Sequence, residues 1–509
     1  MSVATLATAA LDQWALDFDG NAERTLRSAE QAKEAGATYR VSERERWWRK
    51  RRRRSTKRAD LPSPLLSFPF QLGPELELTG YGCEDHFLEP DTEAGAWTAL
   101  ARVLSRGASD GLLLDVGGLA THAGARYNVR VFCLNRRVLL VRPKCALADD
   151  GNYRESRYFS AWRLEREVER YRLPQVMIDL TGQTDAPFGH AILQLADAAL
   201  AAEACEELFT PSPPHAALAL AGVDVVTNGS GSHHQLRKLG TRLDALRAAT
   251  AAGGAYVYSN QRGCDGGRLY YDGCACVIVN GELVAQGAQF ALAEVDVVVA
   301  DVDLGAVRAA RGARASSRAQ SASSSTSLPR IDVDGRLCRQ ERGRPREPSR
   351  PFPPRVHRVE EEIALGPACW LWDYLRRSGA TGFVVPLSGG ADSAAVAAIV
   401  GAMCGLVARA AAAGDAAVAA DARRVARLAD GDEITPSTLA RNLLTTAYMA
   451  STGASGDATR ARAARLASQI GATHVELAID GVVREALKAA TGAVAGCGQP
   501  RFKVSRGGE

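Results

Sequence analysis

A succession of short, almost uninterrupted apolar runs is the feature that most constrains the fold of this chain. Each run has about the length of one strand, and helical patterns separate several of them, starting with residues 22–35 after a strand-like stretch at 5–17. Strands that are apolar on both faces are typical of sheets covered by other layers. The pattern therefore predicts an α/β fold with buried sheets, whose strands include 111–116, 129–134, 138–141, 223–227, 255–259, 276–279 and 295–302.

Composition limits the kinds of protein that the chain can be. Its 509 residues are 46% hydrophobic and 24% charged, which is ordinary for a globular protein, and the net charge of +4 indicates no nucleic-acid partner. We expect no apolar run of the roughly 18 residues that span a bilayer, and no signal peptide. The 11 scattered cysteines form no paired CxxC motifs. They favour a reducing, cytoplasmic location over disulfides or structural zinc.

Two composition changes predict the domain organisation. Residues 306–358 are first Ala/Ser/Arg-rich and then Pro/Arg-rich, which predicts a linker between a domain at 1–305 and another at 359–509. In the second domain, a helix precedes a strand and Gly-rich turn at 381–393. An Ala-rich helix pair, a strand, a helix and a further strand follow. This order is typical of a doubly wound parallel sheet.

Residues 41–71 interrupt the first domain and contain the arginine run 51–54. A nuclear signal or nucleic-acid patch is one interpretation, and a solvated surface insertion is another. We favour a third hypothesis, a translated intron, because Val41-Ser42 can be encoded by a splice donor and SPLLSFPFQ by a pyrimidine tract with its acceptor. A mature transcript that still encodes the arginine run would rule out the intron.

Three stretches carry side chains suited to amide chemistry, namely GPELELTGYGCEDH, LLVRPKCALADDGNYRE and AEACEELFTP. They place Glu75, Lys144 and Cys205 at or near the ends of apolar runs. A thiol can attack a carbonyl carbon, a buried carboxylate can take its proton, and a fixed cation can stabilise the oxyanion. A single buried cysteine is more often an inert small hydrophobe. The combination of all three types favours covalent amide hydrolysis.

These stretches resemble the signature segments of the nitrilase, or carbon–nitrogen hydrolase, superfamily, which has an αββα sandwich and a Glu-Lys-Cys triad. More narrowly, LDQWALDFDGN, GNYRESRYF, NGSGSHHQLRK and NQRGCDGGRLYYDGC resemble the glutaminase domain of eukaryotic-type NAD synthetases. The resemblance implies that Glu75 is the general base, Lys144 the oxyanion stabiliser and Cys205 the nucleophile. It also implies a glutamine pocket lined by Tyr81, Tyr153, Glu206, Phe209 and Ser232.

The second domain carries a Gly-rich loop after the apolar strand GFVV and before a helix. Glycines let a phosphate approach backbone N–H groups, and the helix N-terminus adds its positive dipole end. SGGADS resembles the pyrophosphate loop of N-type ATP pyrophosphatases, not a Walker A loop, because GK[ST] is missing. The resemblance implies an adenine nucleotide α-hydrolase-like fold, Ser388 as a catalytic residue, Asp392 as a Mg²⁺ ligand, and an ATP-binding loop of Pro386, Leu387, Ser388, Gly389, Gly390, Ala391, Asp392 and Ser393.

Together the two halves resemble glutamine-dependent NAD synthetases. That family releases ammonia from glutamine and uses ATP and Mg²⁺, without a prosthetic group, to convert deamido-NAD to NAD, AMP and pyrophosphate. The resemblance implies a homo-oligomer with small-molecule substrates.

The resemblance fades after residue 480, so we expect an incomplete second domain that makes NAD poorly. One alternative is a glutaminase or amidase only, with turnover that ATP and deamido-NAD do not change. Another is an inactive product of an incorrectly spliced gene, without a cooperative melt.

Overall fold

The computed structural model describes residues 2–35, 68–164, 166–323, 328–338, 346–429, 431–452 and 455–494. These residues form two compact units, Met1–Gly366 and Pro367–Glu509. The arginine run and most of the 41–71 segment lie outside the described residues, as do the last residues of the chain.

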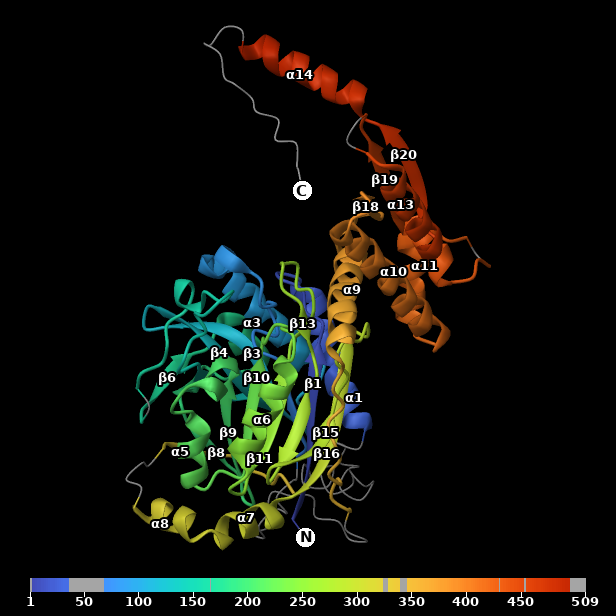
Figure 1. The fold of residues 1–509 in the computed structure, drawn as a ribbon. Coiled ribbons are helices and arrows are strands. Elements are labelled where there is room, and N and C mark those ends of the chain that lie inside the picture. The colour runs from blue at the N-terminus through green and yellow to red at the C-terminus, as the bar shows by residue number, and fades with distance from the viewer. Residues whose placement is uncertain are drawn as a thin grey trace. The chain divides into compact units, whose positions relative to one another are not determined.

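Within its described residues, the first unit contains two large sheets (Figure 1). One is ordered β16-β1-β2-β3-β4-β5-β7-β6 and the other β15-β14-β11-β10-β9-β8-β17. The first consists of β1 (Val3–Leu11), β2 (Phe70–Leu72), β3 (Leu113–His122), β4 (Ala125–Leu134), β5 (Arg137–Pro143), β6 (Val168–Arg172), β7 (Asp185–Gly189) and β16 (Val295–Asp303). The second consists of β8 (Ile192–Gln194), β9 (Ala199–Ala204), β10 (Val225–Ser230), β11 (Ala255–Asn260), β14 (Cys276–Val279), β15 (Glu282–Gln286) and β17 (Arg330–Asp332).

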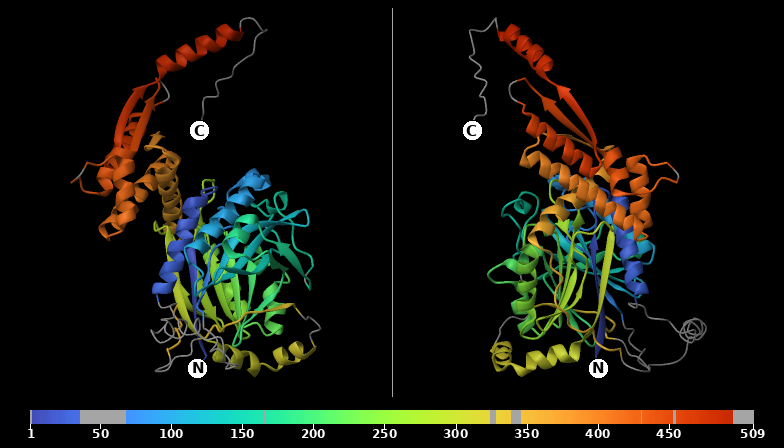
Figure 2. Two further views of the ribbon diagram at one scale, coloured as in Figure 1. Left: turned by 180° about the vertical axis from the view of Figure 1, so that it is seen from behind. Right: turned by 45° about the vertical axis from the view of Figure 1, so that its right-hand side comes forward.

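Helices cover the outer face of each sheet, so the unit has four layers (Figures 1 and 2). Apolar residues from both sheets, including Leu6, Phe70, Leu200 and Val257, form one core between them. The first sheet is covered by α1 (Phe18–Glu34), α3 (Pro90–Ser105) and α4 (Gln175–Thr181), and the second by α5 (Pro214–Leu220) and α6 (Lys238–Thr250). The αββα sandwich and the apolar strands expected from the sequence are confirmed.

The predicted C-terminal boundary of the 41–71 insertion is wrong. Phe70 and Gln71 belong to β2, which pairs in parallel with β1 on one side and β3 on the other. Phe70 and Leu72 are completely buried in the core between the sheets. The described end of this segment is therefore a central strand, and its apolar sequence reflects that burial.

The expected linker at 306–358 also differs in the structure. Its first part continues α7 (Leu304–Ala313) into α8 (Ala315–Ser323), and β17 pairs in parallel with β8. Val307 and Leu337 are buried in the core between the sheets. Scattered apolar residues in a polar segment were enough to attach much of it to the first unit.

The second unit is built on a parallel sheet, β18-β19-β20. One buried apolar cluster of this unit includes Leu387, Ala397, Tyr448 and Ala463. The doubly wound order expected from the sequence is confirmed, with α9 (Val359–Ser378), β18 (Phe383–Pro386), α10 (Ala391–Ala412), α11 (Ala416–Ala426), α12 (Pro436–Leu443), β19 (Leu444–Ala450), α13 (Asp457–Ile470), β20 (Thr473–Ala478) and α14 (Asp480–Val494).

Helix α10 contradicts the expectation that the chain has no apolar run long enough to span a bilayer. Its 22 residues contain an 18-residue window with a mean hydropathy of 1.9, which is long and apolar enough to cross a membrane by composition alone. Many of these residues are alanine, and the helix contacts α11, α12, α13 and β18. Such a helix is also typical of the core of a globular domain.

A buried ion pair within the first sheet also contacts the second sheet. The Arg130 guanidinium on β4 donates to Asp115 Oδ1 on β3 at 2.7 Å, and to the carbonyl oxygens of Gly73 and Pro74 at 2.8 and 2.7 Å. Thr227 on β10 of the other sheet donates to Asp115 Oδ2 at 2.9 Å. Both side chains of the ion pair are almost fully buried, so each depends on its partner for charge compensation.

We predict that Arg130→Met lowers the free energy of unfolding by about 3–5 kcal/mol, because it leaves the Asp115 carboxylate buried without its cation. Urea denaturation measures the change. Arg136→Met is the matched control, since Arg136 pairs with Asp110 at the surface and exposed pairs contribute about 0–1 kcal/mol. Equal losses in the two variants would contradict the role assigned to Arg130.

Candidate active site

Three strands bring the predicted triad together. Strands β2 and β5 run in the same direction, because β3 is parallel to β2 and the β3-β4-β5 pairings are both antiparallel. Glu75 follows β2, Lys144 follows β5, and Cys205 follows β9 in the facing sheet. Glu75 and Lys144 are 0% exposed and Cys205 is 3% exposed. The ends of three strands from two sheets therefore form one buried site.

Direct contacts link the Glu75 carboxylate to the Lys144 ammonium. Lys144 Nζ donates to Glu75 Oε1 at 2.6 Å, and Asn128 Nδ2 donates to the same oxygen at 2.7 Å. The backbone N–H of Gly231 donates to Glu75 Oε2 at 3.1 Å. These donors fix the orientation of the carboxylate before any substrate binds.

The Cys205 thiol lies within electrostatic range of both groups. Burial and the Glu75 charge raise the pKa of Cys205 to about 12, although Lys144 acts in the opposite direction. The resting sulfur is therefore a protonated thiol at neutral pH. Attack by this sulfur requires a base to take the proton during the reaction, which is the chemistry that a neighbouring carboxylate supplies.

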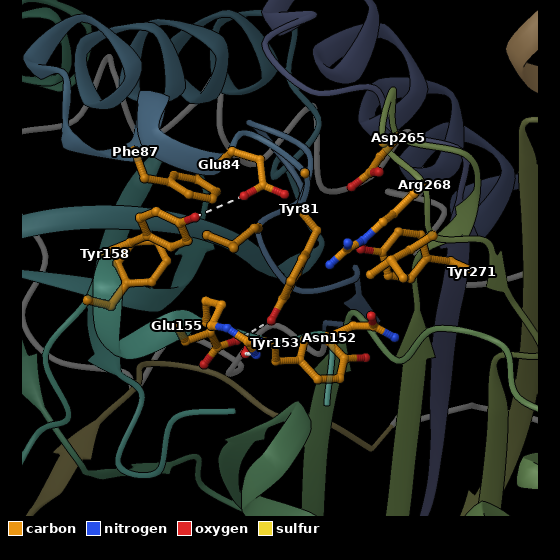
Figure 3. Close-up of a pocket in the computed structure, with 16 residues that line it drawn as sticks. Tyr81, Glu84, Phe87, Asn152, Tyr153, Glu155, Tyr158, Asp265, Arg268 and Tyr271 are labelled. Carbon is orange, nitrogen blue, oxygen red and sulfur yellow. Dashed lines mark hydrogen bonds between the residues drawn. The ribbon is translucent and has the colours of Figure 1, made fainter. Parts of the chain in front are cut away.

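Glu155 is a part of the site that the sequence reasoning missed. Lys144 Nζ donates to Glu155 Oε1 at 2.9 Å, and the Tyr81 hydroxyl donates to the same carboxylate (Figure 3). Burial raises the pKa of Glu155, and the nearby Lys144 ammonium opposes this shift. Burial alone would lower the pKa of Lys144, but the two glutamates raise it well above its usual value. Glu155 is the last residue of GNYRE, one of the stretches that resemble the family, and this position could have identified it as a site residue.

A second buried ion pair holds the two reactive loops together. Arg142, two residues before Lys144, donates to Glu207 Oε2 at 2.7 Å, and neither side chain is exposed. Glu207 also accepts from the backbone N–H of Cys145 and, at 2.7 Å, from that of Ala204. One carboxylate therefore connects the loop that carries Lys144 to the loop that carries Cys205.

A cavity of about 360 Å³ opens onto Cys205. Of the pocket residues expected from the sequence, Tyr153, Glu206, Phe209 and Ser232 line this cavity. Tyr81 instead lines a neighbouring cavity of about 90 Å³, where its ring lies near Tyr153 at a centroid distance of 5.8 Å (Figure 3). The structure brings all five residues to the surroundings of the triad.

Lys238 lies in the same cavity as Glu206 and was not predicted from the sequence. Its Nζ donates to the carbonyl oxygen of His233 at 3.1 Å, and burial lowers the pKa of Lys238. Burial also raises the pKa of Glu206. A cation and a carboxyl group beside one thiol suit a substrate that carries both an ammonium and a carboxylate.

Comparisons with known proteins agree with this geometry. Residues 70–312 match the carbon-nitrogen hydrolase family. The chain is 48% identical to the glutamine-dependent NAD(+) synthetase of Oryza sativa subsp. indica over its whole length, and covers 64% of that protein. It is 45% identical to the enzyme of the same name from Bos taurus, with 99% of this chain and 67% of that protein covered.

The chain belongs to the glutamine-dependent NAD(+) synthetase family. It spans about two thirds of the length of these relatives. Among solved structures, that of a glutamine-dependent NAD(+) synthetase from Cytophaga hutchinsonii has the same fold. The TM-score is 0.70 at 23% sequence identity, and 97% of this chain and 68% of that chain are covered.

The predicted nucleotide loop of this family member lies between β18 and α10. Gly389 has a φ of +79°, and a Cβ at this position would lie 2.2 Å from the Thr459 carbonyl oxygen. Ser393 Oγ accepts from the backbone N–H of Ser388 at 3.2 Å. The loop residues Ser388 and Gly390 are exposed, as are Ala391 and Asp392 at the start of α10. Exposed backbone N–H groups at a helix N-terminus suit a phosphate.

Asp392 in the first turn of α10 is an exposed carboxylate at this loop. Within the described residues, no group of three or more His, Cys, Asp or Glu side chains could hold a metal ion. Mg²⁺ in nucleotide sites is commonly held by one or two carboxylates together with the phosphates of the substrate. A single aspartate fits that mode of binding and does not fit an all-protein metal cage.

Glu77, two residues after Glu75, is a buried acid on the same loop. Thr25 Oγ1 donates to Glu77 Oε1 at 2.7 Å, and the side chain is 1% exposed. Burial raises the pKa of Glu77 from 4.5 to about 7, against smaller opposing effects of Thr25 and Arg130. A group whose pKa is higher in the folded state stabilises the fold while it is protonated, and that contribution is lost as the pH rises through the folded pKa.

We predict that the wild-type protein loses stability relative to Glu77→Gln between about pH 4.5 and pH 7. At about 1.4 kcal/mol per pKa unit, the difference reaches roughly 3 kcal/mol at pH 8. Urea denaturation at pH 5 and pH 8 measures it, with Glu282→Gln at the exposed start of β15 as the control. A stability difference between wild type and the Glu77→Gln variant that is the same at both pH values would show that Glu77 does not titrate in this range.

Proposed function

We propose that the first unit hydrolyses the side-chain amide of glutamine to glutamate and ammonia. The observation that carries this proposal is the buried Glu75–Lys144 pair beside the protonated thiol of Cys205. The cavity at this thiol also contains Glu206 and Lys238, which are suited to the ammonium and carboxylate of an α-amino acid. Tyr153, Phe209 and Ser232 complete the proposed glutamine pocket, with Tyr81 behind it.

In the proposed reaction, Glu75 takes the proton of Cys205 as the sulfur attacks the amide carbon of glutamine. Lys144 stabilises the negative charge that develops on the carbonyl oxygen. The carbon–nitrogen bond breaks, ammonia leaves with the proton held by Glu75, and a thioester to Cys205 remains. Glu75 then takes a proton from water as the water attacks the thioester, and glutamate leaves with the regenerated thiol.

The proposed task of the second unit is to use this ammonia to amidate deamido-NAD. The nicotinate carboxylate attacks the α-phosphorus of ATP and pyrophosphate leaves. Ammonia then attacks the adenylated carboxyl carbon, and AMP leaves to give NAD. In this proposal the loop from Pro386 to Ser393, including Ser388, holds the phosphates, and Asp392 with those phosphates holds Mg²⁺. Glutamine hydrolysis without NAD synthesis is the alternative.

For the glutaminase half, we predict that Cys205→Ala abolishes ammonia release from glutamine, because it removes the sulfur that forms the proposed thioester. Lys144→Met lowers kcat by about 10²–10³-fold, since it removes an oxyanion partner. Coupled detection of ammonia and glutamate measures both. Cys404→Ala in the middle of α10 is the control for loss of a cysteine. Undiminished ammonia release by the Cys205 variant would overturn the proposal.

For the nucleotide half, we predict that Gly389→Ala weakens ATP binding by about tenfold or more. The new Cβ meets the Thr459 carbonyl and must displace the loop, and backbone strain of this kind costs about 1–3 kcal/mol. Gly414→Ala is the matched control, because Gly414 also has a positive φ but has open space around it. Calorimetric titration with Mg-ATP measures the affinity. Equal affinities in the two variants would argue against a phosphate site at this loop.

A further inference from the structure

The backbone of Cys205 is held in an uncommon conformation. Its φ of +42° lies in the left-handed region, where residues other than glycine are rare. Cys205 begins the short helix η3 (Cys205–Phe209) directly after β9. Such a conformation costs of order 1–3 kcal/mol and persists only when the surrounding structure enforces it. The residues that enforce it therefore also decide where the sulfur points.

One carboxamide contacts both sides of the Cys205 backbone. Asn228 Oδ1 on β10 accepts from the backbone N–H of Cys205 at 2.8 Å, and Asn228 Nδ2 lies 3.4 Å from the Cys205 carbonyl oxygen. Asn228 is 0% exposed, so water does not compete for these contacts. Nδ2 also donates to the Tyr256 hydroxyl oxygen at 3.0 Å. The carboxamide thus spans the peptide groups on either side of the sulfur-bearing residue.

The orientation of the Asn228 carboxamide depends on the buried Glu203 carboxylate, which acts through Tyr256. The Glu203 carboxylate on β9 accepts from the Tyr256 hydroxyl and from the backbone N–H of His215, and His215 Nδ1 lies 3.1 Å from Glu203 Oε1. Since Tyr256 donates its only proton to Glu203, its oxygen can only accept from Asn228. Burial and the Glu203 charge raise the pKa of Tyr256 well above its usual value, so it keeps this proton.

The direction of each hydrogen bond therefore follows from the one before it. The Tyr256 hydroxyl proton points to Glu203, so the NH₂ group of Asn228 faces Tyr256. The Asn228 oxygen then faces Cys205 and accepts from its backbone N–H. Tyr256 is 1% exposed, and Glu203 is 0% exposed. A hydrogen-bonded chain in such a low-dielectric environment is stronger and more directional than one in water.

From this arrangement we propose that Asn228 is a positioning residue for the nucleophile, and that Tyr256 and Glu203 act through Asn228 to hold Cys205 in its left-handed conformation. This inference rests on the proposed glutaminase function. None of the three residues lines the cavity at Cys205, so they are not expected to contact glutamine. Their effect is on the rate of attack by the sulfur, not on substrate affinity.

The test compares Tyr256→Phe, Asn228→Ala and the double variant with the wild-type chain. We expect kcat for ammonia release to fall about tenfold in Tyr256→Phe and about a hundredfold in Asn228→Ala, with KM little changed, because misplacement of a reacting group lowers the rate of attack. The double variant should be no slower than Asn228→Ala, since Tyr256 acts only through Asn228. Tyr171→Phe, which removes a buried hydroxyl from β6, is the control.

Hydrogen exchange of the Cys205 amide provides a readout that does not depend on glutamine turnover. We expect faster exchange of this N–H in Tyr256→Phe than in Tyr171→Phe, because the Asn228 oxygen is then free to turn away. If the wild-type chain releases no ammonia but this exchange pattern is seen, the proposed function fails and the positioning role stands. Unchanged kcat and unchanged exchange in Tyr256→Phe, or a fall in kcat that adds fully to that of Asn228→Ala, would overturn the inference.

Discussion

The ammonium group of Lys144 is completely buried, and the organisation of the first unit depends on compensating its charge. Burial of an unpaired ammonium would cost several kcal/mol. Glu75 and Glu155 both lie within 3 Å of Lys144 Nζ. The two carboxylates come from different loops, so neither loop can move far without exposing or isolating a charge. A site held in this way keeps its geometry before the substrate arrives, which is the condition for electrostatic catalysis.

Further buried ion pairs extend this constraint across the sandwich. Arg142–Glu207 connects the loops of Lys144 and Cys205, and Arg130–Asp115 joins neighbouring strands and reaches the other sheet through Thr227. These charges lie beside a largely apolar core between the sheets. Apolar packing holds the sheets together without direction, while the ion pairs fix how the strand ends align. The alignment of the strand ends and the geometry of the triad therefore depend on the same buried ion pairs.

The second unit is organised differently. Its glycine-rich loop is largely exposed and leads into the start of α10, where we propose that backbone N–H groups bind the phosphates. Apolar residues of its sheet and helices, including Leu387, Met403 and Leu439, are buried. The loop depends on the positive φ of Gly389. The Cys205 thiol, with its pKa of about 12, instead requires a base close to the sulfur. In the proposed function, the first unit thus relies on side chains and the second on backbone N–H groups.

The sequence by itself determined the layered α/β class and the doubly wound order of the second unit, and it predicted the residues of the triad and the glycine-rich loop. Short apolar runs and local motifs carry that information, because both are recognised from residues that are consecutive in the chain. Only the tertiary structure decided that Phe70 and Gln71 form a central strand, that Val307 and the strand 330–332 pack on the first unit, and that Glu155, Glu207, Lys238 and Asn228 surround the thiol. These roles arise from contacts between segments far apart in sequence, and a buried charge or amide is recognised only when its partner is known.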